Sequence, residues 1–366
     1  MINPTQLLPA IQFATEAIRP LPRHISILET VRIASASNWI TITSTNLEQT
    51  TIAVIPAPDC QEFQTCVHPK FLMAAANQPE PISLKLEHPF LRIQAGGLSI
   101  NAPLRDPDEF PRTKNLDRIG ELRKEDLRTI CGALAFSSID ESRYILNGVR
   151  LDKTTRLRNW PQWVIATDGR RMQITKLRGE LPFDGIIPNK ALQILERALP
   201  QTKGVEVFQE RQEAGFLLHT DYGTAQLQTK LIEGTYPNVG NQIQEEPVPT
   251  FRWESDLLLQ ELQHLEPLQD SLTIHSDQNG VFLQIKDASL KSHITPLLSR
   301  EINISFNNSY LQSICRALPG ETVQAKLSQA TIDQKSWDRP LLNPLQIDTD
   351  EKTLLLMPMR LNPLNC

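Results

Sequence analysis

The 366-residue sequence has no apolar run long enough to cross a membrane, and no basic-then-apolar stretch at its start. Its longest apolar runs, Leu354–Met357 and Leu257–Leu259, are far shorter than the roughly 20 residues that a membrane-spanning helix needs. Hydrophobic residues make up 40% of the chain, which suffices for ordinary buried cores. We therefore expect a soluble, cytoplasmic protein of two or three domains.

Cysteine is scarce, and the common signatures of enzymes are missing. The five cysteines are an odd number and never form a C-x-x-C pair, so we expect free thiols with neither a disulfide framework nor a zinc site. The seven histidines are scattered, and the sequence has no G-x-S-x-G, H-E-x-x-H, G-x-x-x-x-G-K-[ST] or G-x-G-x-x-G motif. We expect a non-catalytic protein with no cofactor and no metal, in which Asp168 serves as a turn residue.

Excess positive charge is also missing, because the net charge is −5, which argues against a protein that simply coats nucleic acid. The basic residues nevertheless cluster in the middle third of the chain, first over Arg112–Arg128 and again over Arg143–Arg178. A basic strip on an acidic body is typical of a protein that meets phosphates on one face. A solvated surface with interleaved carboxylates is the alternative reading of the same pattern.

One short stretch combines a hairpin signal with fixed charge. Val164–Met172 reads Val-Ile-Ala-Thr-Asp-Gly-Arg-Arg-Met, in which a strand-like apolar run reaches an Asp-Gly turn and continues with two arginines. Such a pattern predicts a β-hairpin with a positively charged tip.

The order of expected elements repeats three times along the chain. Each round consists of a helix, strands, a second helix and further strands, and equivalent prolines recur at the same interval: Pro69 and Pro188 are 119 residues apart, as are Pro200 and Pro319. The repeat predicts three domains, over residues 1–118, 119–247 and 248–366. Because each helix must bury an apolar face against a sheet, we expect an α+β fold with helices on one side and strands on the other.

Individual elements follow from local patterns. We expect a short helix over His68–Asn77 that starts at Pro69, longer helices over Glu121–Ile139 and Ser255–Leu265, and strands over Arg143–Asp152 and Thr353–Met359.

Five strings in this sequence, in this order, resemble those of a known family, the bacterial DNA polymerase III beta subunit or sliding clamp. They are Arg143-Tyr144-Ile145-Leu146-Asn147-Gly148, Ala166-Thr167-Asp168-Gly169-Arg170-Arg171, Thr229–Pro237, Phe306-Asn307-Asn308-Ser309-Tyr310 and Leu356-Met357-Pro358-Met359-Arg360-Leu361. The resemblance implies three repeated clamp domains, each with two helices packed on antiparallel sheets. It also implies that two subunits join head to tail as a ring homodimer.

A clamp of this kind threads double-stranded DNA through its ring without reading sequence, as in other backbone-type recognition. The residues that the resemblance places toward DNA are Arg19, Arg23, Arg123, Lys124, Arg128, Arg143, Tyr144 and Lys190. The alternative is that these are surface charges without a ligand.

The resemblance also implies a cleft that binds short linear motifs of the DNA polymerase III alpha subunit, the clamp loader and repair proteins. Matched by position, its walls are Leu146, Thr167, Gly169, Arg170, Arg171, Met172, Pro237, Asn307, Tyr310, Leu342, Leu355, Met357, Pro358, Met359, Arg360 and Leu361. Methionines and leucines suit an adaptable apolar pocket, while the arginines, Asn307 and Tyr310 suit polar ends of a peptide. A plain buried strand is the alternative for Leu354–Met359.

The sequence departs from the family at a few positions. Arg170 stands where the family usually has histidine, Gly240-Asn241 replaces a basic pair, and Asn362–Cys366 extends the chain beyond the usual end.

Residues expected at the dimer interface are Ile100, Ala102, Leu104, Leu262 and Leu265. A divergent clamp paralogue, which binds clamp partners without encircling DNA, is the alternative function.

Overall fold

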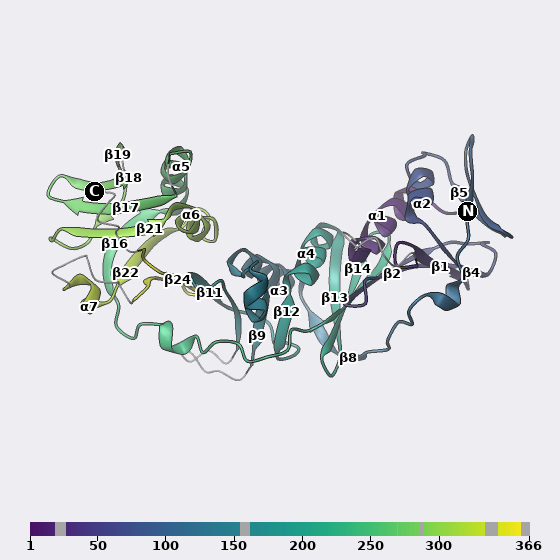
Figure 1. Cartoon of the computed structure of the whole chain (residues 1–366), viewed down its shortest axis with the longest axis horizontal. Helices are drawn as coiled ribbons and strands as arrows, with labels where there is room; N and C mark the ends of the chain where they lie inside the picture. The colour runs from purple at the N-terminus through teal and green to yellow at the C-terminus, as the bar shows by residue number, and fades with distance from the viewer. Residues whose placement is uncertain (19–26, 154–161, 269, 286–287, 334–342, 360–366) are drawn as a thin grey trace. The chain divides into compact units, whose positions relative to one another are not determined.

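The computed structural model describes residues 1–366 except 19–26, 154–161, 269, 286–287, 334–342 and 360–366 (Figure 1). Its contacts divide the chain into two compact units. Unit 1 comprises Met1–Cys131 and Arg178–Glu233, and unit 2 comprises Gly132–Leu177 and Gly234–Cys366. The middle third of the sequence therefore contributes to both units.

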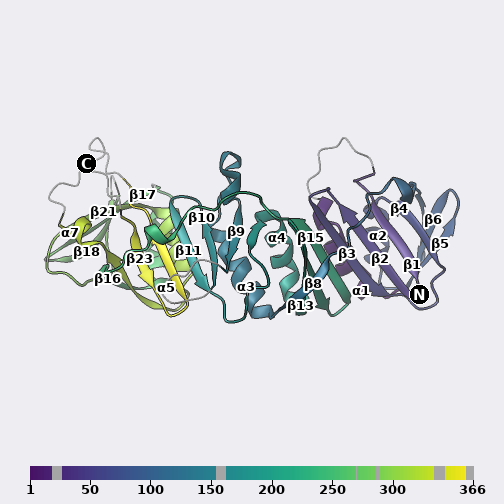
Figure 2. The same cartoon turned by 90° about the horizontal axis from the view of Figure 1, so that it is seen from below.

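Unit 1 is built on an eight-stranded antiparallel sheet in the order β4-β1-β2-β3-β15-β14-β13-β8. These strands are β1 (Val31–Ala36), β2 (Trp39–Thr45), β3 (Gln49–Pro56), β4 (Phe63–Val67), β8 (Asp117–Leu122), β13 (Thr202–Glu210), β14 (Glu213–Thr220) and β15 (Gly223–Lys230). The sheet continues from the first third of the chain into the middle third where β3 pairs with β15 (Figure 2). Burial alternates along β3 from Gln49 to Pro56, as expected for a strand with one face on the core.

Four helices and a smaller sheet complete unit 1. The helices are α1 (Pro4–Ala14), α2 (Pro69–Ala76), α3 (Lys124–Gly132) and α4 (Asn189–Ala198), and the smaller sheet is β5 (Ile82–Glu87), β6 (Phe90–Ala95) and β7 (Leu98–Pro103). Helix α2 begins where the sequence predicts, because Pro69 has the φ of a first helical residue and the His68 side chain accepts from the N–H of Lys70 at 3.2 Å. The strand β12 (Gly185–Pro188) leads directly into α4.

Unit 2 repeats this arrangement with other strands. Its larger sheet has the order β9-β10-β11-β24-β23-β22-β16-β20, and its smaller sheet the order β19-β18-β17-β21. The strands are β9 (Gly148–Asp152), β10 (Trp163–Thr167), β11 (Arg171–Lys176), β16 (Val248–Glu254), β17 (Ser271–Asp277), β18 (Gly280–Ile285), β19 (Ala288–Lys291), β20 (Thr295–Pro296), β21 (Ile302–Asn307), β22 (Thr322–Leu327), β23 (Leu345–Asp348) and β24 (Lys352–Leu356). The helices are α5 (Ser255–Leu265), α6 (Asn308–Arg316) and the short α7 (Gln329–Ile332).

The pairing of β11 with β24 places the last strand of the chain beside the middle third (Figure 2). Arg171 is opposite Leu356 and Met172 is opposite Leu355 in this register. Two segments that are far apart in sequence therefore share one sheet, and the candidate site is built at their junction.

The structure confirms the α+β fold with helices packed on antiparallel sheets, and it confirms α5 at the residues predicted. Three local predictions are wrong in their bounds. The expected strand over Thr353–Met359 is β24, which ends at Leu356. The expected helix over Glu121–Ile139 begins only at Lys124, because residues up to Leu122 pair with β13 as β8. The expected strand over Arg143–Asp152 is a strand only from Gly148, since Glu141–Leu146 forms 3₁₀ turns capped by Asp140. The three-domain boundaries stay a prediction from the repeat.

Candidate functional site: an apolar pocket at a charged hairpin tip

The hairpin predicted around Val164–Met172 is formed by β10 and β11, and its tip is held by its own side chains. Asp168 Oδ1 accepts hydrogen bonds from the backbone N–H groups of Arg170 at 2.8 Å and Arg171 at 2.9 Å. Thr167 Oγ1 accepts from the N–H of Gly169 at 3.0 Å and donates to the carbonyl of Arg171 at 2.7 Å. Gly169 has φ +83°, which a residue with a side chain rarely adopts. The Thr-Asp-Gly sequence thus determines the turn locally.

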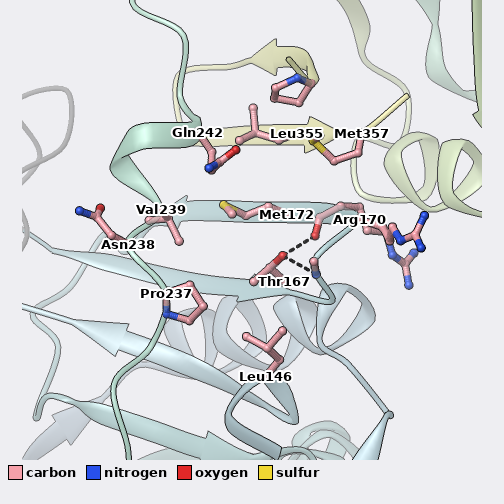
Figure 3. Close-up of a pocket in the computed structure, with 13 residues that line it drawn as sticks. Leu146, Thr167, Arg170, Met172, Pro237, Asn238, Val239, Gln242, Leu355 and Met357 are labelled. Atoms are coloured by element: carbon pink, nitrogen blue, oxygen red, sulfur yellow. Dashed lines mark hydrogen bonds between the residues drawn. The ribbon is translucent and has the colours of Figure 1, made fainter. Parts of the chain in front are cut away.

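A pocket of about 260 Å³ lies against this tip, within unit 2 (Figure 3). Its walls come from the end of the 3₁₀ segment Glu141–Leu146, from the hairpin tip, from the chain around Pro237–Gln242, and from the last strand. The lining residues are Leu146, Thr167, Gly169, Arg170, Arg171, Met172, Pro237, Asn238, Val239, Gln242, Pro344, Leu355 and Met357. A cavity of this size and lining suits a few apolar side chains rather than a large ligand.

The pocket floor is part of the core of unit 2. Met172, Val239 and Leu355 line the pocket and also belong to a buried cluster with Trp163 and Ile174. The N–H of Met357 donates to the carbonyl of Arg170 at 2.8 Å, which extends the β11–β24 contact up to the hairpin tip. Because the floor is core, the pocket is preformed by packing.

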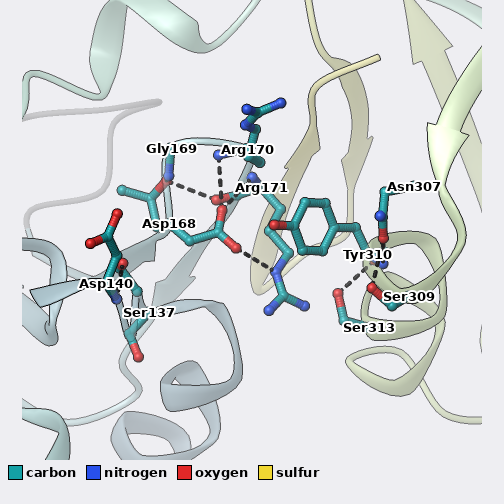
Figure 4. Close-up of polar contacts among 12 residues, drawn as sticks. Ser137, Asp140, Asp168, Gly169, Arg170, Arg171, Asn307, Ser309, Tyr310 and Ser313 are labelled. Atoms are coloured by element: carbon teal, nitrogen blue, oxygen red, sulfur yellow. Dashed lines mark hydrogen bonds and ion pairs between the residues drawn. The ribbon is translucent and has the colours of Figure 1, made fainter. Parts of the chain in front are cut away.

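The two arginines of the tip have different surroundings (Figure 4). Arg171 is mostly buried, and its Nε donates to Asp168 Oδ2 at 3.0 Å. Its guanidinium carbon lies 4.8 Å from the ring centre of Tyr310 and 5.3 Å from that of Phe136. Arg170 is exposed, and its side chain leaves the tip in the opposite direction in Figure 4. Arg171 is therefore a neutralised, packed cation, whereas Arg170 faces solvent at the pocket mouth.

The structure brings together much of the predicted cleft. Leu146, Thr167, Gly169, Arg170, Arg171, Met172, Pro237, Leu355 and Met357 all line the pocket. Asn307, Tyr310, Pro358 and Met359 are described but do not line it, and Leu342, Arg360 and Leu361 lie outside the described residues, as does the extension Asn362–Cys366.

The non-lining residues have other contacts. Asn307 caps α6 by accepting from the N–H of Tyr310 at 3.1 Å, and the ring of Tyr310 contacts the hairpin tip at the guanidinium of Arg171. Met359 leaves the sheet of β24, since its N–H donates to the carbonyl of Ser305 at 2.7 Å.

Four lining residues were not predicted: Asn238, Val239, Gln242 and Pro344. The first three follow directly after the Tyr236-Pro237 string, so a prediction extended by a few residues would have included them. Pro344 reaches the pocket only because β23 pairs with β24, which no local pattern indicates.

The residues predicted to face DNA occur in both units. Arg123 is bound by Asp126, with Nε–Oδ2 at 2.7 Å and Nη2–Oδ1 at 3.0 Å, and this hydrogen bonding raises the pKa of Arg123. Lys124 donates to the carbonyl of Pro200 at 3.3 Å. Arg128 on α3 and Lys190 on α4 are exposed. In unit 1, Arg128 and Lys190 thus face solvent from helices. The side chains of Arg123 and Lys124 are already hydrogen-bonded within the unit.

Arg143 and Tyr144 lie in unit 2, next to the hairpin tip. Arg143 Nη1 donates to the carbonyl of Asp168 at 3.3 Å, and Tyr144 is 61% exposed. Arg19 and Arg23 lie outside the described residues.

The residues predicted at a dimer interface are less accessible than the sequence suggested. Ala102, Leu262 and Leu265 are buried within their own units, so their side chains serve the core, while Ile100 and Leu104 are half-buried. Strand β7, which contains Ile100, is nevertheless an edge strand of its sheet. An edge strand offers backbone N–H and C=O groups for pairing with another chain.

The described part of the chain contains four cysteines, and all are free, as predicted. Burial raises the pKa of the Cys66 thiol to about 11 and those of Cys131 and Cys315 to about 12. Within the described ranges, no group of three or more His, Cys, Asp or Glu side chains is placed to hold a metal ion. No helix in those ranges has the length and apolar character to span a membrane.

Comparison with known proteins gives one consistent result. Residues 121–238 match the family model described as "DNA polymerase III beta subunit, central domain". The beta sliding clamp of Buchnera aphidicola is 26% identical over 278 residues, which cover 73% of this chain and 72% of that protein.

Solved structures agree in fold over 98% of this chain. The Bartonella birtlesii clamp bound to griselimycin has a TM-score of 0.85 at 18% identity, with 98% of its own chain covered. The Helicobacter pylori clamp bound to a DNA ligase peptide has a TM-score of 0.80 at 15% identity, with 99% of its chain covered.

The resemblance found in the five sequence strings is therefore confirmed by independent comparisons of sequence and of structure. The chain therefore has the sliding-clamp fold, its residues 121–238 match the central-domain model of the DNA polymerase III beta subunit, and its sequence is similar, at low identity, to bacterial beta sliding clamps.

Proposed function

We propose that this chain is a DNA sliding clamp that tethers a replicative polymerase to duplex DNA and docks other proteins through the pocket at the hairpin tip. One observation carries the proposal: segments from the middle and the end of the sequence meet in unit 2 to form a preformed apolar pocket with a cationic rim. Apolar anchors in such a pocket, with polar contacts around it, are how short peptides are bound. The relative from Helicobacter pylori carries a DNA ligase peptide, which supports the same use here.

The role proposed is non-catalytic, with no cofactor, in the cytoplasm. The partners proposed are double-stranded DNA held without sequence preference, the DNA polymerase III alpha subunit, the clamp loader and other proteins with clamp-binding motifs. Exposed cations on α3 and α4, such as Arg128 and Lys190, suit loose contacts with phosphates. Arg123 contributes less to DNA binding in this proposal, since Asp126 already binds its guanidinium.

A head-to-tail homodimer would close the ring. The edge strand β7 supplies backbone groups in unit 1, and the exposed rims of Ile100 and Leu104 supply apolar contact. Purified protein is then expected to have a native mass near 83 kDa, twice the 41.4 kDa of the chain. A monomer at micromolar concentration would contradict a stable ring.

Retention on DNA tests encirclement directly. Protein loaded by a clamp loader onto nicked circular DNA should remain bound in moderate salt and be lost when the circle is linearised, because it slides off the ends. Equal loss from circular and linear DNA would refute encirclement. Peptide binding without such retention would instead identify the divergent paralogue that binds clamp partners without enclosing DNA.

A further inference from the structure

Arg170 is fixed at the pocket mouth by its backbone rather than by its side chain. Its N–H donates to Asp168 Oδ1 at 2.8 Å, and its carbonyl accepts from the N–H of Met357 at 2.8 Å. The side chain lines the pocket and is exposed to solvent. Because its backbone is held in this way, the guanidinium can reach only the region around the rim of the pocket.

The positive charge of Arg170 is uncompensated at this rim. The carboxylate of Asp168 is occupied by two backbone N–H groups and by the guanidinium of Arg171. Among the described residues that line the pocket, none is acidic. Over the part of the chain that the structure describes, the Arg170 side chain forms no hydrogen bond or ion pair. In the described part of the chain, the apolar floor is therefore bordered by a cation that no carboxylate neutralises.

We propose that Arg170 makes the pocket selective for peptides that carry an aspartate or glutamate next to their apolar anchor residues. This inference rests on the proposed function of the pocket as a peptide site. The planar guanidinium can donate two parallel hydrogen bonds to a carboxylate, whereas an amide offers only one acceptor oxygen and an ammonium group offers none. Asn238 and Gln242 on the opposite wall are neutral, so they add hydrogen bonding without a charge preference.

The test measures binding of synthetic peptides to the full-length protein by fluorescence anisotropy. The peptides share a Leu and a Phe as apolar anchors, and each flanking position is occupied in turn by Asp, Asn or Lys. At one flanking position, we expect the Asp peptide to bind about two- to fivefold more tightly than the Asn peptide. This difference in affinity is typical of a solvent-exposed ion pair. This preference should shrink at roughly 0.5 M salt, where exposed charges are screened.

Variants of Arg170 test whether its side chain causes the preference for the Asp peptide. Because its structural contacts are made by the backbone, Arg170→Gln should fold normally and lose the preference for Asp, so that the Asp and Asn peptides bind this variant with equal affinity. Arg170→Lys should keep part of the preference, and Arg170→Glu should invert it in favour of the Lys peptide. Arg211→Gln, at the exposed turn between β13 and β14, is the matched control and should change nothing.

The outcomes separate this inference from the function on which it rests. Equal binding of the Asp and Asn peptides, or a preference that survives in Arg170→Gln, would overturn acid selection while leaving the peptide pocket in place. Failure to bind any peptide of the set, together with loss from circular DNA, would overturn the proposed function itself.

Discussion

Replacing Arg171 by alanine should weaken unit 2 where the hairpin tip meets α6. The arginine joins three groups from separate parts of the sequence, since it pairs with Asp168 and lies over the rings of Phe136 and Tyr310. Side-chain exposure is only 16% for Arg171 and 12% for Asp168, so solvent screens their interaction incompletely.

The expected cost of the Arg171 substitution follows from these contacts. An ion pair at this depth contributes about 1 kcal/mol, and each cation–ring contact contributes about 0.5–1 kcal/mol. Asp168 keeps two backbone donors after the substitution, so its carboxylate is not left without partners. We therefore expect Arg171→Ala to lower the free energy of unfolding by about 2–3 kcal/mol, and Arg171→Lys by about 1 kcal/mol because the charge is retained.

Urea unfolding followed by tryptophan fluorescence measures these changes, and a double-mutant cycle isolates the ring contact. Arg171→Ala, Tyr310→Leu and the double variant should give a coupling energy of about 0.5–1 kcal/mol. A coupling near zero would show that Arg171 and Tyr310 are neighbours without energetic interaction, and it would refute the view that Tyr310 supports the pocket through Arg171.

Three further outcomes are expected. Gly169→Ala should destabilise the protein by about 1–2 kcal/mol in urea unfolding, because an alanine is strained at φ +83°; an unchanged midpoint would contradict the turn geometry. The pKa of Glu206 is lowered chiefly by its hydrogen bond with His219, so its stabilising contribution is present above pH 4.5 and is lost as the pH falls. Glu206→Gln should accordingly be less stable than the parent at pH 7, and the difference should narrow as the pH falls below 4.5; a difference that stays constant over this acid range would argue against the linkage. In a Cys366→Ser background, a thiol reagent at pH 8 should modify Cys60 first, since the other described thiols are buried; fast labelling of a second thiol would show that the core opens.

Sequence reasoning succeeded where a signal was local or repeated. The Asp168-Gly169 turn, the helix that starts at Pro69 and the α+β alternation each depend on a few adjacent residues, and each appears in the structure. It failed where pairing partners decided the outcome. Residues 117–122 pair with β13 as a strand, although the residues that follow them have a helical pattern. The backbone at the edge of a sheet offers hydrogen bonds to a neighbouring segment, and the local sequence does not indicate which segment will form them.

The candidate site shows the same division between sequence and tertiary structure. The sequence by itself determined the hairpin, its two arginines and the apolar character of the last strand, since these follow from residue types at short spacing. Only the tertiary structure decided that Met172 is opposite Leu355, that Pro344 reaches the pocket, and that Arg171 is neutralised while Arg170 faces solvent. The physical reason is that strand pairing and charge compensation depend on groups that are distant in sequence, and folding alone brings them within contact distance.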